Sequence, residues 1–440
     1  MRSILYVCLF AACLTAQPQQ TVSIADPIEA KLTEGNLALR QARFADAERI
    51  YLEAVAMAQE LPDSDIRKAK SWNNLGALYH QQARYSEAED LYKKALPIYE
   101  TLVGVSRSAY AAVLNNYAEV VRMRGRYDEA EQLYRNSIRV RELDNPDDPG
   151  VAASMNNLAV LLNQRLRAEE AETLARRALE IWNNTYNGKH PYVASGLNTL
   201  GEALRIQNRL AEAAECHRRA VEIRKEVLSP EHPDVATGIS NLASMLYEQK
   251  NYTESEELYQ EAARIRMKAF GPNHPSVAFL HNNLGTSVLA QGRTIEAENH
   301  FREAMRILET AGAAGHVDYA KTVENLASMF VLQEKMQGAE SLYLRALKLR
   351  EKVLGPRHAA IANSYDWLAA FYFKQGRETE AEKCLKKALD IRESALGREA
   401  PAVALSLQRL ANMYASQDRK DAAEEMNRRA NRILKLQPVR

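Results

Sequence analysis

Hydrophobic and polar positions along the chain follow the spacing of amphipathic helices. One segment places apolar side chains at the i, i+3, i+4 and i+7 positions that share one helix face: Ile239, Leu242, Ala243 and Leu246. After a polar break the same spacing resumes over residues 252–269. The pattern predicts a helix hairpin, in which two helices bury their apolar faces against each other.

This hairpin pattern recurs at a fixed interval. One leucine of the first helix returns every 42 residues, at Leu158, Leu200, Leu242, Leu284, Leu326, Leu368 and Leu410, and earlier copies stand at Leu75 and Tyr117. A regular period of about 20–50 residues indicates a stack of repeats rather than separate globular domains. The sequence therefore predicts an all-α solenoid over residues 28–437, with about ten hairpins that start near residues 28, 69, 111, 152, 194, 236, 278, 320, 362 and 404.

A connector of recurring composition joins each hairpin to the next. Residues 271–275 read Gly-Pro-Asn-His-Pro, with glycine typical of a helix end and proline typical of a helix start. The connector histidines are His190, His232, His274, His316 and His358. Stacked helix layers lie about 10 Å apart, whereas metal–nitrogen bonds are about 2 Å long, so neighbouring histidines cannot share an ion. We expect these histidines to serve the turns and not a metal site.

Four recurring positions identify the repeat. The eighth position is small, the twentieth is alanine, the twenty-fourth is bulky and the twenty-seventh is small. In the seventh repeat these residues are Gly285, Ala297, Phe301 and Ala304, and in the second they are Gly76, Ala88, Tyr92 and Ala95. In this pattern the chain resembles the tetratricopeptide repeat (TPR) family, and its 42-residue period resembles the repeats of kinesin light chain. The resemblance implies a right-handed superhelix with a concave, peptide-binding groove. It does not imply motor transport, because no heptad coiled coil precedes the repeats.

Composition and charge argue against several other classes of function. The 58 lysines and arginines nearly balance the 57 aspartates and glutamates, giving a formal net charge of +1. No strong field therefore favours nucleic acid or an anionic membrane. The sequence contains no metalloprotease, hydrolase, phosphate-binding or Cys-x-x-Cys pattern. We expect a protein that is not an enzyme and has no cofactor or metal. Cys216 and Cys384 stand four repeats apart, and because stacked repeats contact only their neighbours, both are expected to be free thiols.

The first residues predict export. A basic start, an apolar run over residues 4–14 and small residues before a Gln/Pro-rich segment are typical of a signal peptide. We expect a signal over residues 1–16 and a linker over residues 17–27. Two alternatives stay open: a lipoprotein acylated at Cys13, and a buried N-terminal helix. No other stretch is long and apolar enough to span a membrane, so we expect a periplasmic or extracellular protein.

The candidate ligand-binding residues lie on the first-helix face opposite the core. At 100° per residue, positions 2, 6, 9 and 13 of each first helix point away from core positions 4, 7, 8 and 11, and in the TPR fold this face lines the groove. The sixth position is often asparagine, whose amide offers the donors and the acceptor that a peptide bond needs. The predicted peptide-binding residues are Asn74, Asn116, Asn157, Asn241, Asn283, Asn325 and Trp367.

Two interpretations of this asparagine row stay open. The row binds peptide, or it is a spacer whose amides link adjacent helices. Asparagine also recurs at the fifth position, on the flank of the helix, where we expect the structural role. Trp367 and Phe373 form an apolar patch near the C-terminal end that anchors a ligand, packs between repeats or joins subunits. Charges of both signs accompany the row, so no ligand charge is predicted.

The predicted function is an exported scaffold that binds peptide segments or partner proteins in the groove. The alternative is a structural role in an envelope complex or in a homo-oligomer. The tenth repeat ends within three residues of Arg440, and no polar capping helix follows it, although solenoid ends are normally capped. We therefore expect any self-association to use this C-terminal end.

Overall fold

The computed structural model describes residues 26–41, 43–101, 103–312 and 317–435, and every regular element within them is an α-helix. The twenty helices, in chain order, are α1 (Pro27–Arg40), α2 (Phe44–Gln59), α3 (Ile66–Gln81), α4 (Tyr85–Thr101), α5 (Val103–Met123), α6 (Tyr127–Glu142), α7 (Pro149–Gln164), α8 (Ala168–Tyr186), α9 (Pro191–Ile206), α10 (Leu210–Val227), α11 (Pro233–Glu248), α12 (Tyr252–Phe270), α13 (Pro275–Ala290), α14 (Thr294–Thr310), α15 (Val317–Leu332), α16 (Met336–Leu354), α17 (Ile361–Lys374), α18 (Glu378–Leu396), α19 (Pro401–Ser416) and α20 (Lys420–Lys435). In these described ranges, no helix combines the length and the apolar character that crossing a bilayer requires.

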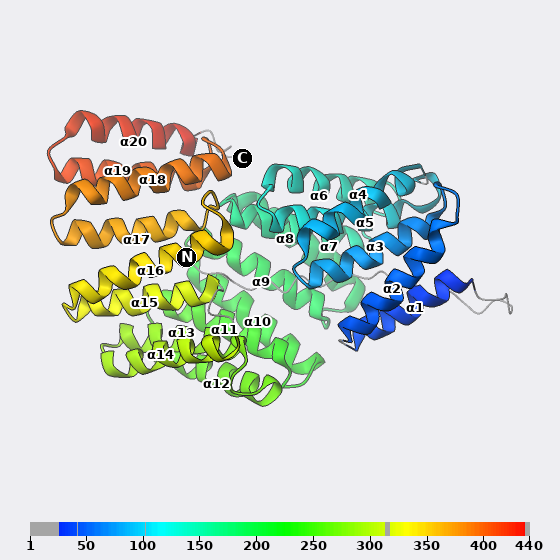
Figure 1. Cartoon of the computed structure of the whole chain (residues 1–440), viewed down its shortest axis with the longest axis horizontal. Coiled ribbons are helices and arrows are strands. Elements are labelled where there is room, and N and C mark those ends of the chain that lie inside the picture. Colours follow the sequence, from blue (N-terminus) through cyan, green and yellow to red (C-terminus); the bar gives the residue numbers. More distant parts are fainter. Residues whose placement is uncertain (1–25, 42, 102, 313–316, 436–440) are drawn as a thin grey trace. The chain divides into compact units, whose positions relative to one another are not determined.

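The described residues divide into two compact parts, each a series of helix hairpins (Figure 1). The N-terminal part contains residues 26–161 and 173–187, and the C-terminal part contains residues 162–172 and 188–435. Helices pack in consecutive pairs, from α1 with α2 to α5 with α6 in the N-terminal part and from α9 with α10 to α19 with α20 in the C-terminal part. Second helices also pack against the next first helix, as α16 does against α17. The predicted all-α stack of hairpins is confirmed.

The connectors start and stop helices as the sequence predicts. A proline occupies the first turn of α9, α11 and α13, and the histidine before it caps the helix: the Nδ1 atoms of His190, His232 and His274 each accept a hydrogen bond of 3.2 Å from the backbone N–H two residues later. Gly271 ends α12 at a φ of 85°, a conformation that favours glycine. Because the proline belongs to the helix, these helices begin three residues before the predicted repeat starts.

The small and bulky positions form the core of each hairpin. The Phe301 ring on α14 is fully buried against Gly285 on α13. A Cβ atom at Gly285 would lie only 2.7 Å from Cε1 of that ring. Ala297 and Ala304, on the same helix as the phenylalanine, are fully buried as well. Small residues therefore recur because the two helices of a hairpin approach each other too closely for a larger side chain.

Candidate functional site

The predicted row of ligand-binding residues lies on first helices, on the side away from the hairpin core. Its members are Asn74 on α3, Asn116 on α5, Asn157 on α7, Asn241 on α11, Asn283 on α13, Asn325 on α15 and Trp367 on α17. The six asparagines are partly exposed, and Trp367 is 45% exposed. Their neighbours on both sides in the sequence are more deeply buried in most repeats, as Asn282 and Leu284 are around Asn283.

Three of these asparagines contact the preceding repeat. The three hydrogen bonds run from Asn74 to Asn36 (3.4 Å), from Asn157 to Asn115 (3.1 Å) and from Asn325 to Asn282 (2.8 Å), with the row amide donating to the other amide oxygen. For the other three, Asn116, Asn241 and Asn283, the described residues provide no side-chain hydrogen bond. The row therefore contains both linking amides and amides whose donors and acceptor are available.

The fifth position of the first helix is structural. Asn156, Asn198 and Asn282 are at most 8% exposed. In the orientation that satisfies its amide, Asn198 donates to Nδ1 of His217 at 2.9 Å and accepts from Nη1 of Arg224 at 2.8 Å. Burial, followed by the positive charge of Arg224, lowers the pKa of His217 to about 3, so this imidazole is neutral at pH 7.

Acidic residues replace asparagine at the fifth position of the eighth and ninth repeats, and each pairs with a buried arginine. Glu324 binds Arg350, and Oγ of Ser364 donates to the same carboxylate at 2.6 Å. Asp366 binds Arg392 in the same way. These arginines recur at the 42-residue period with Arg224, so the repeat contained a signal that sequence analysis missed. The contact links a second helix both to its own first helix and to the next one.

A second set of ion pairs connects neighbouring hairpins. An arginine just before one second helix binds a glutamate near the start of the preceding second helix: Arg84 with Glu48, Arg126 with Glu89, Arg209 with Glu172, Arg293 with Glu256, Arg377 with Glu340 and Arg419 with Glu382, at 2.6–2.9 Å. Ala214 and Asn251 occupy the two positions of this pair in the fifth and sixth repeats, so both charges are missing together. We call these pairs the glutamate–arginine ladder.

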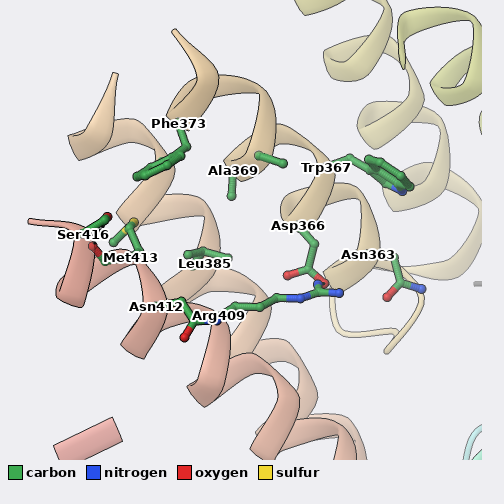
Figure 2. Close-up of a pocket in the computed structure, with 12 residues that line it drawn as sticks. Asn363, Asp366, Trp367, Ala369, Phe373, Leu385, Arg409, Asn412, Met413 and Ser416 are labelled. Atoms are coloured by element: carbon green, nitrogen blue, oxygen red, sulfur yellow. Dashed lines mark hydrogen bonds and ion pairs between the residues drawn. The ribbon is translucent and has the colours of Figure 1, made fainter. Parts of the chain in front are cut away.

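A cavity of about 520 Å³ opens on the first-helix face between α17, α18 and α19. Its lining residues are Asn363, Asp366, Trp367, Ala369, Ala370, Phe373, Ala381, Leu385, Arg409, Asn412, Met413 and Ser416. The apolar walls come from all three helices. Figure 2 shows Phe373, Met413 and Ser416 toward one end, and Asp366, Arg409 and Asn363 toward the other.

The polar end of this cavity is built on a buried aspartate. The Asp366 side chain is 10% exposed, and its Oδ2 atom pairs with Arg392 from α18 and with Arg409 from α19. Arg392 also donates to Asn363 at 2.8 Å and to Ser406 at 2.6 Å. Oδ1 of Asp366 is buried and has no hydrogen-bond donor among the described residues. One carboxylate faces two guanidinium groups, so this end has an excess positive charge.

The remaining sequence predictions concern histidine, cysteine and the N-terminus. His190, His232 and His274 cap helices, as described above, and Nδ1 of His358 likewise accepts from the N–H of Ala360 at 3.2 Å. Cys216 and Cys384 are partly buried, and neither forms a disulfide within the described residues, as predicted. In the described ranges, no three His, Cys, Asp or Glu side chains gather as metal ligands would. His316, Cys13, the expected signal over residues 1–16 and most of the linker lie outside the described residues.

Stacked helix hairpins with small residues facing bulky ones define a helical repeat protein. The tetratricopeptide repeat description matches residues 28–101, 110–178, 155–226, 234–310 and 360–435, and a second description of this repeat matches residues 320–360. The chain belongs to the tetratricopeptide repeat family. No curated protein matches the sequence.

Several solved structures are similar to this chain. A Rap protein complexed with Competence and Sporulation Factor is 13% identical, with a TM-score of 0.56 over 93% of this chain and 98% of that one. The human IFIT1 dimer with m7Gppp-AAAA is 16% identical, with a TM-score of 0.51 over 94% of this chain and 92% of that one. BtubC (BKLC) from P. vanneervenii is 22% identical, with a TM-score of 0.43 over 56% of this chain and 93% of that one. At these identities the likeness concerns the fold alone.

Proposed function

We propose that this protein is a scaffold that binds an extended peptide segment of a partner protein along the first-helix face. One observation carries the proposal: the cavity is lined by helix positions that the sequence predicts to face the ligand. Positions 2, 6 and 9 of the ninth repeat and 6, 9 and 13 of the tenth contribute Asn363, Trp367, Ala370, Arg409, Asn412 and Ser416. Its volume lies within the range of about 300–1,000 Å³ that is usual for ligand sites.

The available amides of the row suit a peptide backbone. Asn241 and Asn283 stand one repeat apart, on α11 and α13. Within the described residues, neither side-chain amide forms a hydrogen bond to the protein. An extended peptide presents N–H and C=O groups along its length, and each amide can serve one of either kind. Recognition of this type depends little on the peptide sequence, so specificity would come from the cavity.

The chemistry of the face supports a peptide more than a nucleic acid. The net charge is +1, and nucleic-acid recognition normally requires a basic stripe. Chains of the same fold include both a Rap protein complexed with Competence and Sporulation Factor and IFIT1 with m7Gppp-AAAA. Those ligands differ in chemistry, so the fold alone does not determine the class of ligand. For this protein the class is inferred from its own residues.

The test replaces the row without touching the core. Asn241→Ala, Asn283→Ala and Asn325→Ala are combined, and the matched control combines Asn299→Ala with Asn427→Ala, two exposed asparagines on second helices. We expect wild type and control to retain a partner from an envelope extract and the triple variant to lose it, with equal helical content by circular dichroism. Equal retention by all three proteins would exclude the row as the binding surface.

We also infer that the protein works outside the cytoplasm. The support is the sequence of residues 1–16, with its basic start, short apolar core and small residues before the Gln/Pro-rich segment. Expression of the full chain in a secreting host, followed by mass measurement of the mature N-terminus, tests this. Cleavage after Ala16 is expected. An acylated Cys13 would support the lipoprotein alternative, and an intact Met1 in the cytoplasm would contradict export.

A further inference from the structure

The ninth repeat lacks a pair of side chains that fills the equivalent place in the sixth and eighth repeats. In the eighth repeat Tyr343 and Ala327 belong to one buried cluster, and the tyrosine hydroxyl lies 2.7 Å from Oγ of Ser328. The sixth repeat has the same arrangement, with 2.6 Å between the Tyr259 hydroxyl and Ser244. In the ninth repeat the equivalent residues are Leu385 and Ala370. The ring and the partner of its hydroxyl are thus missing together.

The walls around this vacant place are unusually apolar for an accessible surface. Trp367 is 45% exposed and Phe373 is 42% exposed, both on α17, while Leu385 and Met413 form the inner wall. When an apolar group covers exposed aromatic side chains at the edge of an apolar cavity, apolar surface leaves water and the free energy decreases. The space far exceeds that of one water molecule, whose share of liquid volume is about 30 Å³.

The polar end of the cavity has both a donor and an acceptor to offer. Arg409 is 45% exposed at its side chain and has five N–H donors, of which the ion pair with Asp366 uses only part. Asn412 is exposed one turn further along α19. The amide oxygen of Asn412 is the acceptor, because Oδ1 of Asp366 is buried out of reach of a ligand. A ligand group with one N–H and one C=O fits this combination.

We propose that this cavity is the anchor site of the scaffold, where one apolar side chain of leucine to phenylalanine size enters between Trp367, Leu385 and Met413. The peptide group beside that side chain is held at the polar end. Its carbonyl oxygen accepts from Arg409, and its N–H donates to the amide oxygen of Asn412. The anchor deepens the proposed function and rests on it, because the same first-helix positions lead from the cavity back to Asn325 and Asn283.

The first experiment uses small probes with the full chain. The probes are N-acetylphenylalanine N-methylamide, which has an apolar side chain between two peptide groups, N-acetylglycine N-methylamide, which has no side chain, and toluene, which has no peptide group. Probe-observed saturation-transfer NMR measures binding. We expect saturable binding of the phenylalanine amide, and at least tenfold weaker binding of the other two. Equal binding of the glycine amide, or no binding of the phenylalanine amide, would overturn the anchor; equal binding of toluene would overturn the hold on the peptide group.

The second experiment closes the cavity with residues that this chain already uses. Ala370→Ser combined with Leu385→Tyr rebuilds in the ninth repeat the tyrosine–serine pair of the eighth, and Leu344→Tyr, at an exposed leucine of α16 outside the cavity lining, is the matched control. We expect the double variant to bind the phenylalanine amide at least tenfold more weakly, and the control to bind as wild type does. Leu385→Phe repeats the test without a new hydroxyl. Unchanged binding by a folded double variant or by Leu385→Phe would overturn the proposal.

The two proposals fail in different ways. The triple variant at Asn241, Asn283 and Asn325 leaves the cavity lining intact, so it should bind the phenylalanine amide like wild type. Partner binding that survives closure of the cavity would overturn the anchor and leave the scaffold function standing. If the protein binds the phenylalanine amide but the triple variant still retains the partner protein, the asparagine row is not the binding surface and the anchor stands.

Discussion

The buried pair of Glu324 and Arg350 gives the sharpest test of how adjacent hairpins are held together. Their side chains are 5% and 8% exposed, and Ser364 of the next repeat donates to Glu324 and accepts from Arg350. Removing one partner of such a pair costs about 3–5 kcal/mol, because the other charge stays buried, whereas replacing both with apolar residues is often neutral. We expect Glu324→Leu to cost this amount at every pH, since an arginine keeps its charge.

The reverse substitution should depend on pH. Burial raises the pKa of Glu324, so without its arginine the carboxyl takes up a proton in the folded state. Protonating a carboxyl whose unfolded pKa is about 4.3 costs about 1.36 kcal/mol per pH unit above that value, or about 3.7 kcal/mol at pH 7 and about 1 kcal/mol at pH 5. The folded chain then binds a proton that the unfolded chain has lost, so stability decreases as pH rises. We expect Arg350→Met to follow this dependence, and the Glu324→Leu, Arg350→Met double variant to lie near wild type.

Hydrogen exchange of α15 to α17, compared with wild type at the same pH, measures these differences locally, which suits a stack that does not unfold as one unit. Arg306→Met is the control, because its pair with Glu303 is exposed and worth less than about 1 kcal/mol. A double variant as unstable as the sum of the two singles would refute the argument. So would an Arg350→Met cost that is the same at pH 5 and pH 7.

Three further predictions concern packing, acid sensitivity and the ladder. Gly285→Ala should lose about 1–3 kcal/mol of stability to the clash with Phe301, although alanine is otherwise the better helix former; a higher melting temperature would contradict the close contact. Stability should fall as pH drops below about 6.5, because the unfolded chain binds a proton that the folded chain excludes from His217 down to about pH 3. In His217→Tyr the urea midpoints of unfolding at pH 7 and pH 4 should lie closer together than in wild type. A difference between the two midpoints as large as in wild type would rule this cause out. Arg293→Ala should cost more than the roughly 1 kcal/mol of a surface pair, because it takes a partner from the Glu256 carboxylate, whose side chain is only 11% exposed, and high salt should change the loss little; a smaller loss that disappears in high salt would show that the pair behaves as a surface pair.

The elements of the fold could be predicted because their causes are local. The spacing of Leu242 and its neighbours, the glycine at 271 and the proline at 275 all act within one or two helical turns. The structure accordingly has α12 (Tyr252–Phe270) within one residue of the predicted range 252–269. The 42-residue period then repeats the same local solution along the chain, which made the family recognisable.

The cavity could not be predicted in the same way. Leu385 and Ala370 both line it, and they stand fifteen residues apart in the sequence, on the two helices of one hairpin. Comparing Leu385 with Tyr343 and Ala370 with Ser328 would have shown that both were lost in one repeat. It would not have shown that the neighbouring side chains leave the space open, because repacking could have closed it.

The sequence by itself determined that asparagine recurs on the first-helix face. Helix geometry places the sixth position of each first helix away from the core. Only the tertiary structure decided which of these amides are available. Asn325 reaches the amide of Asn282 in the preceding repeat. For Asn283 the equivalent residue is Ser240, whose side chain is shorter, and no such bond forms. For Asn241 it is Asn198, which is already held by His217 and Arg224. Identical residues at identical repeat positions therefore differ in their contacts, because the partners of these amides lie 38, 42 and 43 residues away in the sequence and packing sets the contacts of those partners.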